Sequence, residues 1–210
     1  RANRLFRFDL ASPDRYRERM IRRESLLSLE AYAKQRSQFR AKVMEHKKRR
    51  TVHLGGNVTL QFEDELTIRY QVQEMLRIER IFEEEGIQHE LDAYNPLVPD
   101  GGNWKATMMI EYPDPDERRR MLAALKGIER RVWVRVGDLE PVYAIADEDL
   151  ERENDEKTSS VHFLRFELDT AMRERLRGGI PVSVGVDHPQ YRAAVELEPE
   201  VRAALASDLA

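Results

Sequence analysis

The sequence predicts an α+β fold with a mixed, largely antiparallel sheet, a long N-terminal helix, a buried second helix and a C-terminal helix. Strand-like alternation occurs in neighbouring pairs, and helical periodicity occurs in segments between those pairs rather than in strict βαβ order. The chain has 210 residues, of which 41% are hydrophobic, so it is long and apolar enough to bury the core of one domain.

The N-terminal helix is predicted from about residue 29 to residue 48. Apolar residues recur there at helical spacing, at Leu29, Tyr32, Phe39 and Val43. Ser28 is the expected N-cap. The basic run at 46–50 ends the helix, where cations complement the helix dipole, and we interpret it as a solvated face.

A hairpin and a second helix follow. Residues 52–54 and 58–62 alternate around a turn at Gly55, Gly56 and Asn57. Asp64 caps a helix that is expected to run to about Glu85 and to stop at Gly86. This helix is apolar on two sides, which is typical of a helix sandwiched inside a domain.

Glu79 falls in the middle of one apolar stripe of the second helix, and Arg77 interrupts the other side. A buried carboxylate must be paired, hydrogen-bonded or protonated. Two interpretations stay open. A structural ion pair with a nearby arginine is favoured, and a site residue with a perturbed pKa is the alternative.

The remaining elements follow from alternation, turn formers and helix caps. Between residues 94 and 102 the turn formers predict a loop, and residues 147–158 are almost wholly charged and predict an exposed loop. Strands are expected at 87–93, 104–112, 132–136, 161–168, 182–186 and 192–197, and helices at 116–126, 170–178 and 199–209.

For the domain organisation we expect an N-terminal extension over residues 1–24 and a single α+β domain over residues 25–210, with the exposed charged loop near 147–158. The first residues contain arginines but no apolar run of a secretory signal. Met20 directly precedes the first well-patterned segment and is a candidate for the native start.

Composition excludes several classes of site. The chain has no cysteine, so a disulfide, a cysteine-ligated metal or cluster and a cysteine nucleophile are ruled out within it. The net charge of −4 argues against nucleic acid as a partner. No stretch has the roughly 20 apolar residues of a membrane span. We expect a cytoplasmic protein that binds neither nucleic acid nor membrane, and no cofactor is indicated because phosphate-loop and catalytic motifs are lacking.

The densest polar cluster lies at residues 88–95. As a strand, this segment would place His89 on one face and Glu90 with Asp92 on the other. A metal site built from Glu79, His89 and Asp92 is conceivable, but no paired-histidine motif signals it, and ordinary surface carboxylates are the favoured interpretation. The candidate binding residues are Arg77, Glu79, His89, Glu90, Asp92, Tyr94 and Asn95.

Several strings resemble the bacterial family known as domain of unknown function 3501. They are residues 69–81 and 86–95, the opening 29–32, residues 186–189 with Tyr191, and the final helix. The resemblance covers residues 26–209. Members of that family are often encoded beside a rubrerythrin-like protein and an iron–sulfur oxidoreductase, which implies a redox or peroxide-defence setting and implies no catalytic residues.

Two function hypotheses follow. The leading one is a non-catalytic accessory or interaction protein of a cytoplasmic redox system, with the rubrerythrin-like and iron–sulfur proteins as partners. The alternative is a metal- or small-ligand-binding enzyme that uses Glu79 as acid or base and His89 as ligand or proton shuttle. The basic first helix and the arginine-rich start favour a homodimer.

Overall fold

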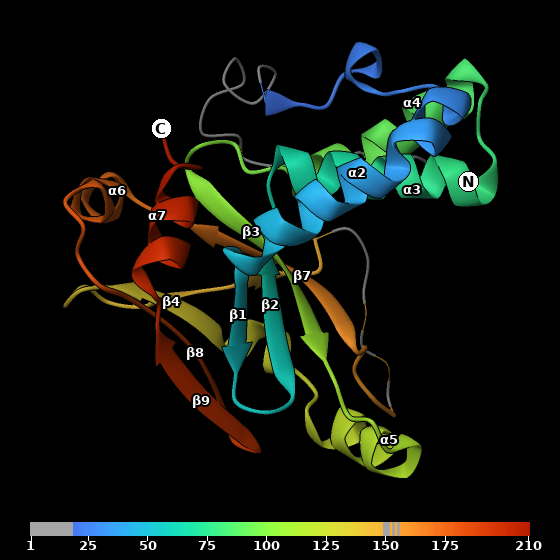
Figure 1. Cartoon of the computed structure of the whole chain (residues 1–210). Helices are drawn as coiled ribbons and strands as arrows, with labels where there is room; N and C mark the ends of the chain where they lie inside the picture. Colours follow the sequence, from blue (N-terminus) through green and yellow to red (C-terminus); the bar gives the residue numbers. More distant parts are fainter. Residues whose placement is uncertain (1–18, 149–151, 153, 155) are drawn as a thin grey trace.

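The computed structural model describes residues 19–148, 152, 154 and 156–210, and it has an α+β architecture with two antiparallel sheets (Figure 1). Sheet A has the order β1-β2-β3-β7-β6, and sheet B has the order β5-β4-β8-β9. Among the described residues every strand pairing is antiparallel, which confirms the predicted fold class. The strands are β1 (Thr51–Leu54), β2 (Val58–Phe62), β3 (Asn103–Ile110), β4 (Val132–Val136), β5 (Val142–Tyr143), β6 (Ile145–Ala146), β7 (Val161–Glu167), β8 (Val182–His188) and β9 (Tyr191–Glu196).

Helices α2, α3 and α4 gather at one end of sheet A, and α6 and α7 lie beside the sheets at the C-terminal end of the chain (Figure 1). Short 3-10 helices connect several elements. The helices are α2 (Leu29–Lys48), α3 (Glu65–Glu79), α4 (Glu84–Tyr94), α5 (Pro115–Ala124), α6 (Thr170–Arg177) and α7 (Pro199–Ala206), and the 3-10 helices are η1 (Arg23–Ser25), η2 (Asn95–Leu97) and η3 (Ile128–Arg131).

The main hydrophobic core joins the inward-facing residues of both sheets with α6 and α7. Alternation along β3 sends Trp104, Ala106 and Met108 into this core, where each is at most 2% exposed. Phe62 of β2 meets Trp104 edge-on, with ring centroids 5.9 Å apart. The opposite side chains of β3, including Lys105, therefore face the helices.

A second, smaller core holds the helical layer together. It is formed by Ile68, Val72 and Leu76 of α3 with Ile87 and Leu91 of α4. The segment before α2 covers this core, because its aliphatic side chains are buried there as well. Residues 1–18 of the predicted N-terminal extension lie outside the described residues.

The prediction of a strand at 87–93 is wrong, because this segment forms α4. Helix α3 ends at Glu79 and not at Glu85, since Arg80 adopts a left-handed conformation (φ 55°) and its N–H caps the Leu76 carbonyl. Ile87 and Leu91 are four residues apart, so a helix buries both on α3. A short apolar pattern does not separate this arrangement from a strand.

Gly86 is also not the stop of a helix but lies inside α4, close to Ile81. A Cβ atom at this position would come within 2.7 Å of the Ile81 Cγ2 atom. The glycine therefore permits the tight approach between the α3–α4 connection and the first turn of α4.

Candidate functional site

A cavity of about 360 Å³ lies between the helical layer and the outer face of sheet A. Its volume is in the range of small-molecule sites. Helices α3 and α4 and the η2 turn form one wall, and strands β3 and β7 form the other. The apolar lining residues are Met75, Ala93, Pro96, Leu97, Phe163 and Leu164, and the polar ones are Glu90, Tyr94, Lys105, Glu148, Arg152 and Arg165.

Lys105 is the buried cation of this cavity. It lies on β3 opposite Arg165 of β7 and is only 5% exposed, and its ammonium group donates to the Pro96 carbonyl oxygen. Burial disfavours the charged form and lowers the pKa of Lys105 to about 8, against the partial opposition of Asp100. At neutral pH a measurable fraction of this amine is therefore unprotonated.

Arg165 fixes the rim of the cavity. Its Nε and Nη2 atoms donate to the two carboxylate oxygens of Glu148, each at 2.7 Å, and its Nη1 atom donates to Glu167. A bidentate pair of this kind is geometrically specific and among the stronger hydrogen-bonded ion pairs. Arg165 thus forms ion pairs with two carboxylates of the protein and positions Glu148 at the edge of the cavity.

A buried histidine anchors the segment that leads to Glu148. His162 is 0% exposed, and its Nδ1 atom lies 2.6 Å from Asp147 Oδ2. Its Nε2 atom lies 3.0 Å from both Thr158 Oγ1 and the Ser159 carbonyl oxygen. These contacts tie both ends of the predicted charged loop to β7. Residues 149–151, 153 and 155 of that loop lie outside the described residues.

The structure brings two of the predicted site residues into the cavity. Glu90 and Tyr94 lie one helical turn apart on α4 and both line it. The Glu90 side chain is 16% exposed. Burial raises the pKa of Tyr94, whose hydroxyl also interacts with Gln71. Glu90 and Tyr94 therefore contribute a carboxylate and a phenol to the lining of the cavity.

The other predicted site residues lie elsewhere. Asn95 is buried and structural, since its side chain accepts from the Ile21 N–H at 2.8 Å and donates to the Ile21 carbonyl oxygen at 3.1 Å. His89 is 83% exposed on the outer face of α4. Glu79 is exposed at the C-terminal end of α3, and Asp92 is exposed on α4. Arg77 is half-exposed.

Because Glu79 is exposed, its carboxylate is not a member of a buried ion pair, and it is not part of a metal site among the described residues. In the described part of the chain, no three histidine, aspartate or glutamate side chains are arranged to hold a metal ion. The metal site considered for Glu79, His89 and Asp92 does not form. The helix stripe placed Glu79 among apolar residues, but α3 ends there and leaves it in solvent.

The partly buried carboxylate of α3 that joins it to α2 is Glu74, whose side chain is 15% exposed. It accepts from both Arg36 Nε at 2.7 Å and Arg36 Nη2 at 2.8 Å, and from the Tyr32 hydroxyl at 2.7 Å. Arg77 adds a contact at 3.2 Å. This cluster joins α2 to α3, and the arginine hydrogen bonds hold the pKa of Glu74 down at about 2.

Acid should weaken this cluster. The ordinary pKa of Glu74 is 4.5 and its folded-state pKa is about 2. Its contribution to stability is therefore present above pH 4.5 and is lost as the pH falls towards 2. We expect a loss of about 2 kcal/mol, below the full value of the shift because Arg36 is partly exposed to solvent.

Urea unfolding at pH 6 and pH 3 measures this effect. Glu74→Gln should reduce the difference in unfolding free energy between the two pH values. Glu30→Gln is the matched control on α2, because the Glu30 carboxylate is 81% exposed and pairs only with Lys34 among the described residues. Equal pH dependence in wild type and Glu74→Gln would contradict the assignment.

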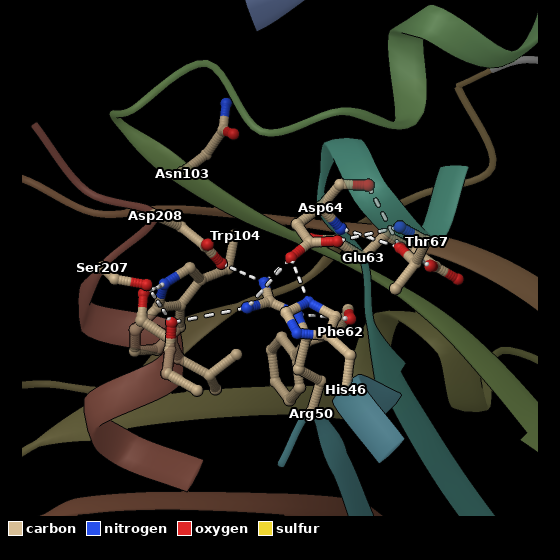
Figure 2. Close-up of polar contacts among 12 residues, drawn as sticks. His46, Arg50, Phe62, Glu63, Asp64, Thr67, Asn103, Trp104, Ser207 and Asp208 are labelled. Carbon is tan, nitrogen blue, oxygen red and sulfur yellow. Dashed lines mark hydrogen bonds and ion pairs between the residues drawn. The ribbon is translucent and has the colours of Figure 1, made fainter. Parts of the chain in front are cut away.

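A second polar network surrounds Arg50 (Figure 2). The sequence analysis placed Arg50 in a solvated basic run, but it is 1% exposed. Its guanidinium contacts the carboxylates of Asp208 and Asp64 and donates to the Phe62 and Glu63 carbonyl oxygens, each at 3.2 Å. Burial raises the pKa of Asp208 to about 6. Through Arg50, this network links the C-terminal residues to β2 and to the N-terminal end of α3.

A wider hollow of about 1010 Å³ borders this network. Its lining residues include Asp64, Ser207 and Asp208 together with Arg19, Met20, Arg22, Glu24 and Ser25. The carboxylates of Asp64 and Asp208 already bind Arg50, and Arg19 donates to the Asp208 carbonyl oxygen. Its polar groups hold the fold together, so the cavity around Lys105 is the better candidate for a ligand.

Comparison with known proteins identifies the family. A family model described as protein of unknown function (DUF3501) matches residues 20–209. The chain belongs to this family. Membership confirms the resemblance inferred from the sequence strings. No curated protein matches the chain.

A solved structure supports the fold of this DUF3501 protein. A crystal structure of a protein of unknown function from Burkholderia pseudomallei K96243 is 60% identical in sequence, with a TM-score of 0.87. The match covers 91% of this chain and 100% of that chain. In the described residues no helix has the length and apolar character needed to cross a membrane.

Sequence reasoning missed Lys105, Arg165 and Phe163 as cavity residues. A signal for Lys105 was available, because it is the one charged residue of strand β3. A charged residue at such a position is either at an edge or faces a specific partner. The cross-strand neighbour Arg165 became visible only when the sheet order was known.

Proposed function

We propose that this DUF3501 protein binds a small organic molecule with an apolar body in the cavity between α3, α4 and strands β3 and β7. The observation that carries the proposal is an apolar cavity of about 360 Å³ with the buried amine of Lys105 in its wall. The Lys105 ammonium group donates to the Pro96 carbonyl oxygen and adds a polar group to the mainly apolar lining. A ligand with an apolar body and one polar group matches this combination.

The fluorescent probe 8-anilinonaphthalene-1-sulfonate tests the cavity, because it has an apolar body and one polar group. We expect saturable binding with enhanced fluorescence. Ala93→Trp fills the cavity from α4 and should weaken binding about tenfold or more, as expected when a bound aromatic body loses its contacts. Leu97→Arg is a second blocking variant at the η2 wall.

Two controls separate the cavity from other apolar surface. Ala33→Trp makes the same change at an exposed position of α2. Phe82→Ser removes a large apolar side chain that is 71% exposed, the highest value for such a side chain among the described residues. Both variants should bind the probe like the wild type. Binding that is absent, or that is lost in Phe82→Ser and kept in Ala93→Trp, would reject the proposal.

The accessory role in a cytoplasmic redox system is the second candidate, and exposed apolar side chains favour it. Ile78 is 57% exposed and Phe82 is 71% exposed, and both lie near the turn between α3 and α4. Exposed apolar clusters of this kind mark interaction surfaces. The partner to be tested first is the rubrerythrin-like protein that the family resemblance implies.

Co-purification tests this second candidate. The tagged chain and the rubrerythrin-like protein should elute together in size-exclusion chromatography, and Ile78→Ser with Phe82→Ser should separate them. Ile180→Ser is the control at another exposed apolar side chain, which is 37% exposed. Separate elution of the two wild-type proteins would reject the accessory role, and the elution volume of the chain alone would test the expected homodimer.

A further inference from the structure

We propose that Lys105 is a nucleophilic amine that forms an imine with an aldehyde or ketone bound in the cavity. This inference rests on the proposed function, because it names the chemical class of the ligand. Lys105 lies on β3, which is paired on both sides with β2 and β7, so its position is fixed by rigid structure. Reactive groups held on rigid elements are positioned most accurately.

The surroundings of Lys105 suit this chemistry. The apolar side chains of Met75, Leu97 and Phe163 line the same cavity. The charged groups that influence the amine are Asp100, Glu148, Glu167 and Arg165. Burial keeps the pKa of Lys105 at about 8 despite the three carboxylates, and desolvation in an apolar pocket is a known way to activate a lysine.

The reaction balances with groups present in the cavity. The lone pair of the neutral amine forms a bond to the carbonyl carbon, and the carbonyl oxygen takes up a proton, which gives a carbinolamine. The carbon–oxygen bond then breaks as the oxygen takes a second proton and leaves as water. The nitrogen supplies both protons in the net reaction, and Glu90 and Tyr94 line the cavity as groups that can relay them.

The uncharged carbonyl group also agrees with the charge balance of the cavity. Arg165 is bound by Glu148 and Glu167, so it holds its counterions within the protein. Arg152 stacks on the Phe163 ring at 4.6 Å and lies 3.3 Å from Asp147. An uncharged ligand with an apolar body therefore suits the cavity better than a strongly anionic one, and an aldehyde or ketone meets this condition.

Reductive trapping tests the inference on the full chain. Benzaldehyde and sodium cyanoborohydride convert an imine to a stable benzyl amine, and peptide mass spectrometry locates the modified lysines. At pH 7 we expect Lys105 to react about tenfold faster than the exposed Lys34 or Lys42, because burial favours the neutral, nucleophilic form of the Lys105 amine. The ratio of Lys105 to Lys34 labelling should fall as the pH rises above 8.

Matched variants make the result decisive. Ala93→Trp should slow labelling of Lys105 and leave Lys34 unchanged, whereas Ala33→Trp should change neither. Lys105→Met should remove the fast-reacting site, and Lys105→Arg serves the same purpose if the methionine variant is unstable. Circular dichroism checks folding in each case.

The two proposals fail in different ways. If the naphthalene probe binds and is blocked by Ala93→Trp, but Lys105 reacts no faster than Lys34, imine formation is rejected and ligand binding stands. If neither the probe nor benzaldehyde shows a preference for the cavity, both proposals are rejected.

Discussion

Arg50→Met should lower the free energy of unfolding by about 3–5 kcal/mol, the cost of removing one partner from a buried ion pair. Arg50 is 1% exposed and contacts the carboxylates of Asp64 and Asp208. Its removal leaves the buried Asp208 carboxylate without this cation, whereas the partly buried Asp64 keeps its contacts with His46 and the Thr67 N–H. Three backbone carbonyl oxygens, those of Phe62, Glu63 and Ala204, also lose a donor.

Urea unfolding followed by circular dichroism measures the loss. Arg49→Met is the matched control, because Arg49 is the exposed neighbour in the same basic run and its loss should cost less than about 0.5 kcal/mol. A double-mutant cycle with Asp208→Asn isolates the pair. If Arg50→Met and Arg49→Met were equally stable, the network in Figure 2 would not stabilise the C-terminal segment as described.

Trp104→Ala should be similarly severe, with an expected loss of about 3–5 kcal/mol for truncating a large core aromatic residue. Trp104 is 0% exposed, and its indole N–H donates to the Leu205 carbonyl oxygen at 2.8 Å. The substitution opens a cavity between β3 and α7 and removes the indole donor from that carbonyl, which still accepts from the Asp208 N–H. It also removes the edge-on contact with Phe62.

The second tryptophan provides the comparison. Trp133 on β4 is half-buried and covers Gly185 of the neighbouring strand β8. Trp133→Ala should cost about 1 kcal/mol, near the centre of the distribution for point substitutions. Thermal unfolding of both variants gives the ranking. An equal loss at the two positions would show that the contact of Trp104 with α7 adds no stability beyond ordinary burial.

The loss of Trp104 should also affect the cavity. Trp104 and Lys105 are consecutive residues of β3 and point to opposite faces of sheet A. Trp104 is packed between the sheets, and this packing sets the orientation of the strand that carries Lys105. Loss of Trp104 is therefore expected to loosen the wall of the ligand site as well as the core.

Local patterns in the sequence determined most of the elements. Ser28 and Asp64 cap their helices as predicted, with side chains that accept from Ala31 and Thr67. The hairpin forms around the predicted turn at Gly55, Gly56 and Asn57 and pairs Leu54 with Val58. These features depend on residues a few positions apart, so composition and spacing are sufficient to specify them.

Only the tertiary structure decided the end of α3 and the identity of α4. Arg80 has a left-handed backbone conformation, which costs free energy in a residue other than glycine. No local sequence pattern predicted this conformation. The packing of Ile87 and Leu91 on α3 stabilises a helix in a segment whose short pattern also fitted a strand. The buried status of Arg50 likewise depends on Asp208, which is 158 residues away along the chain.

The candidate site was likewise predicted only in part from the sequence. The polar density of residues 88–95 drew attention to Glu90 and Tyr94, which do line the cavity. Lys105 and Arg165 are 60 positions apart in sequence and become neighbours only because β3 pairs with β7. The sequence by itself therefore determined the caps and the hairpin and indicated two residues of one cavity wall. The helix that carries those two residues was decided by tertiary packing, and the opposite wall was decided by strand pairing, a long-range arrangement that local residue patterns do not encode.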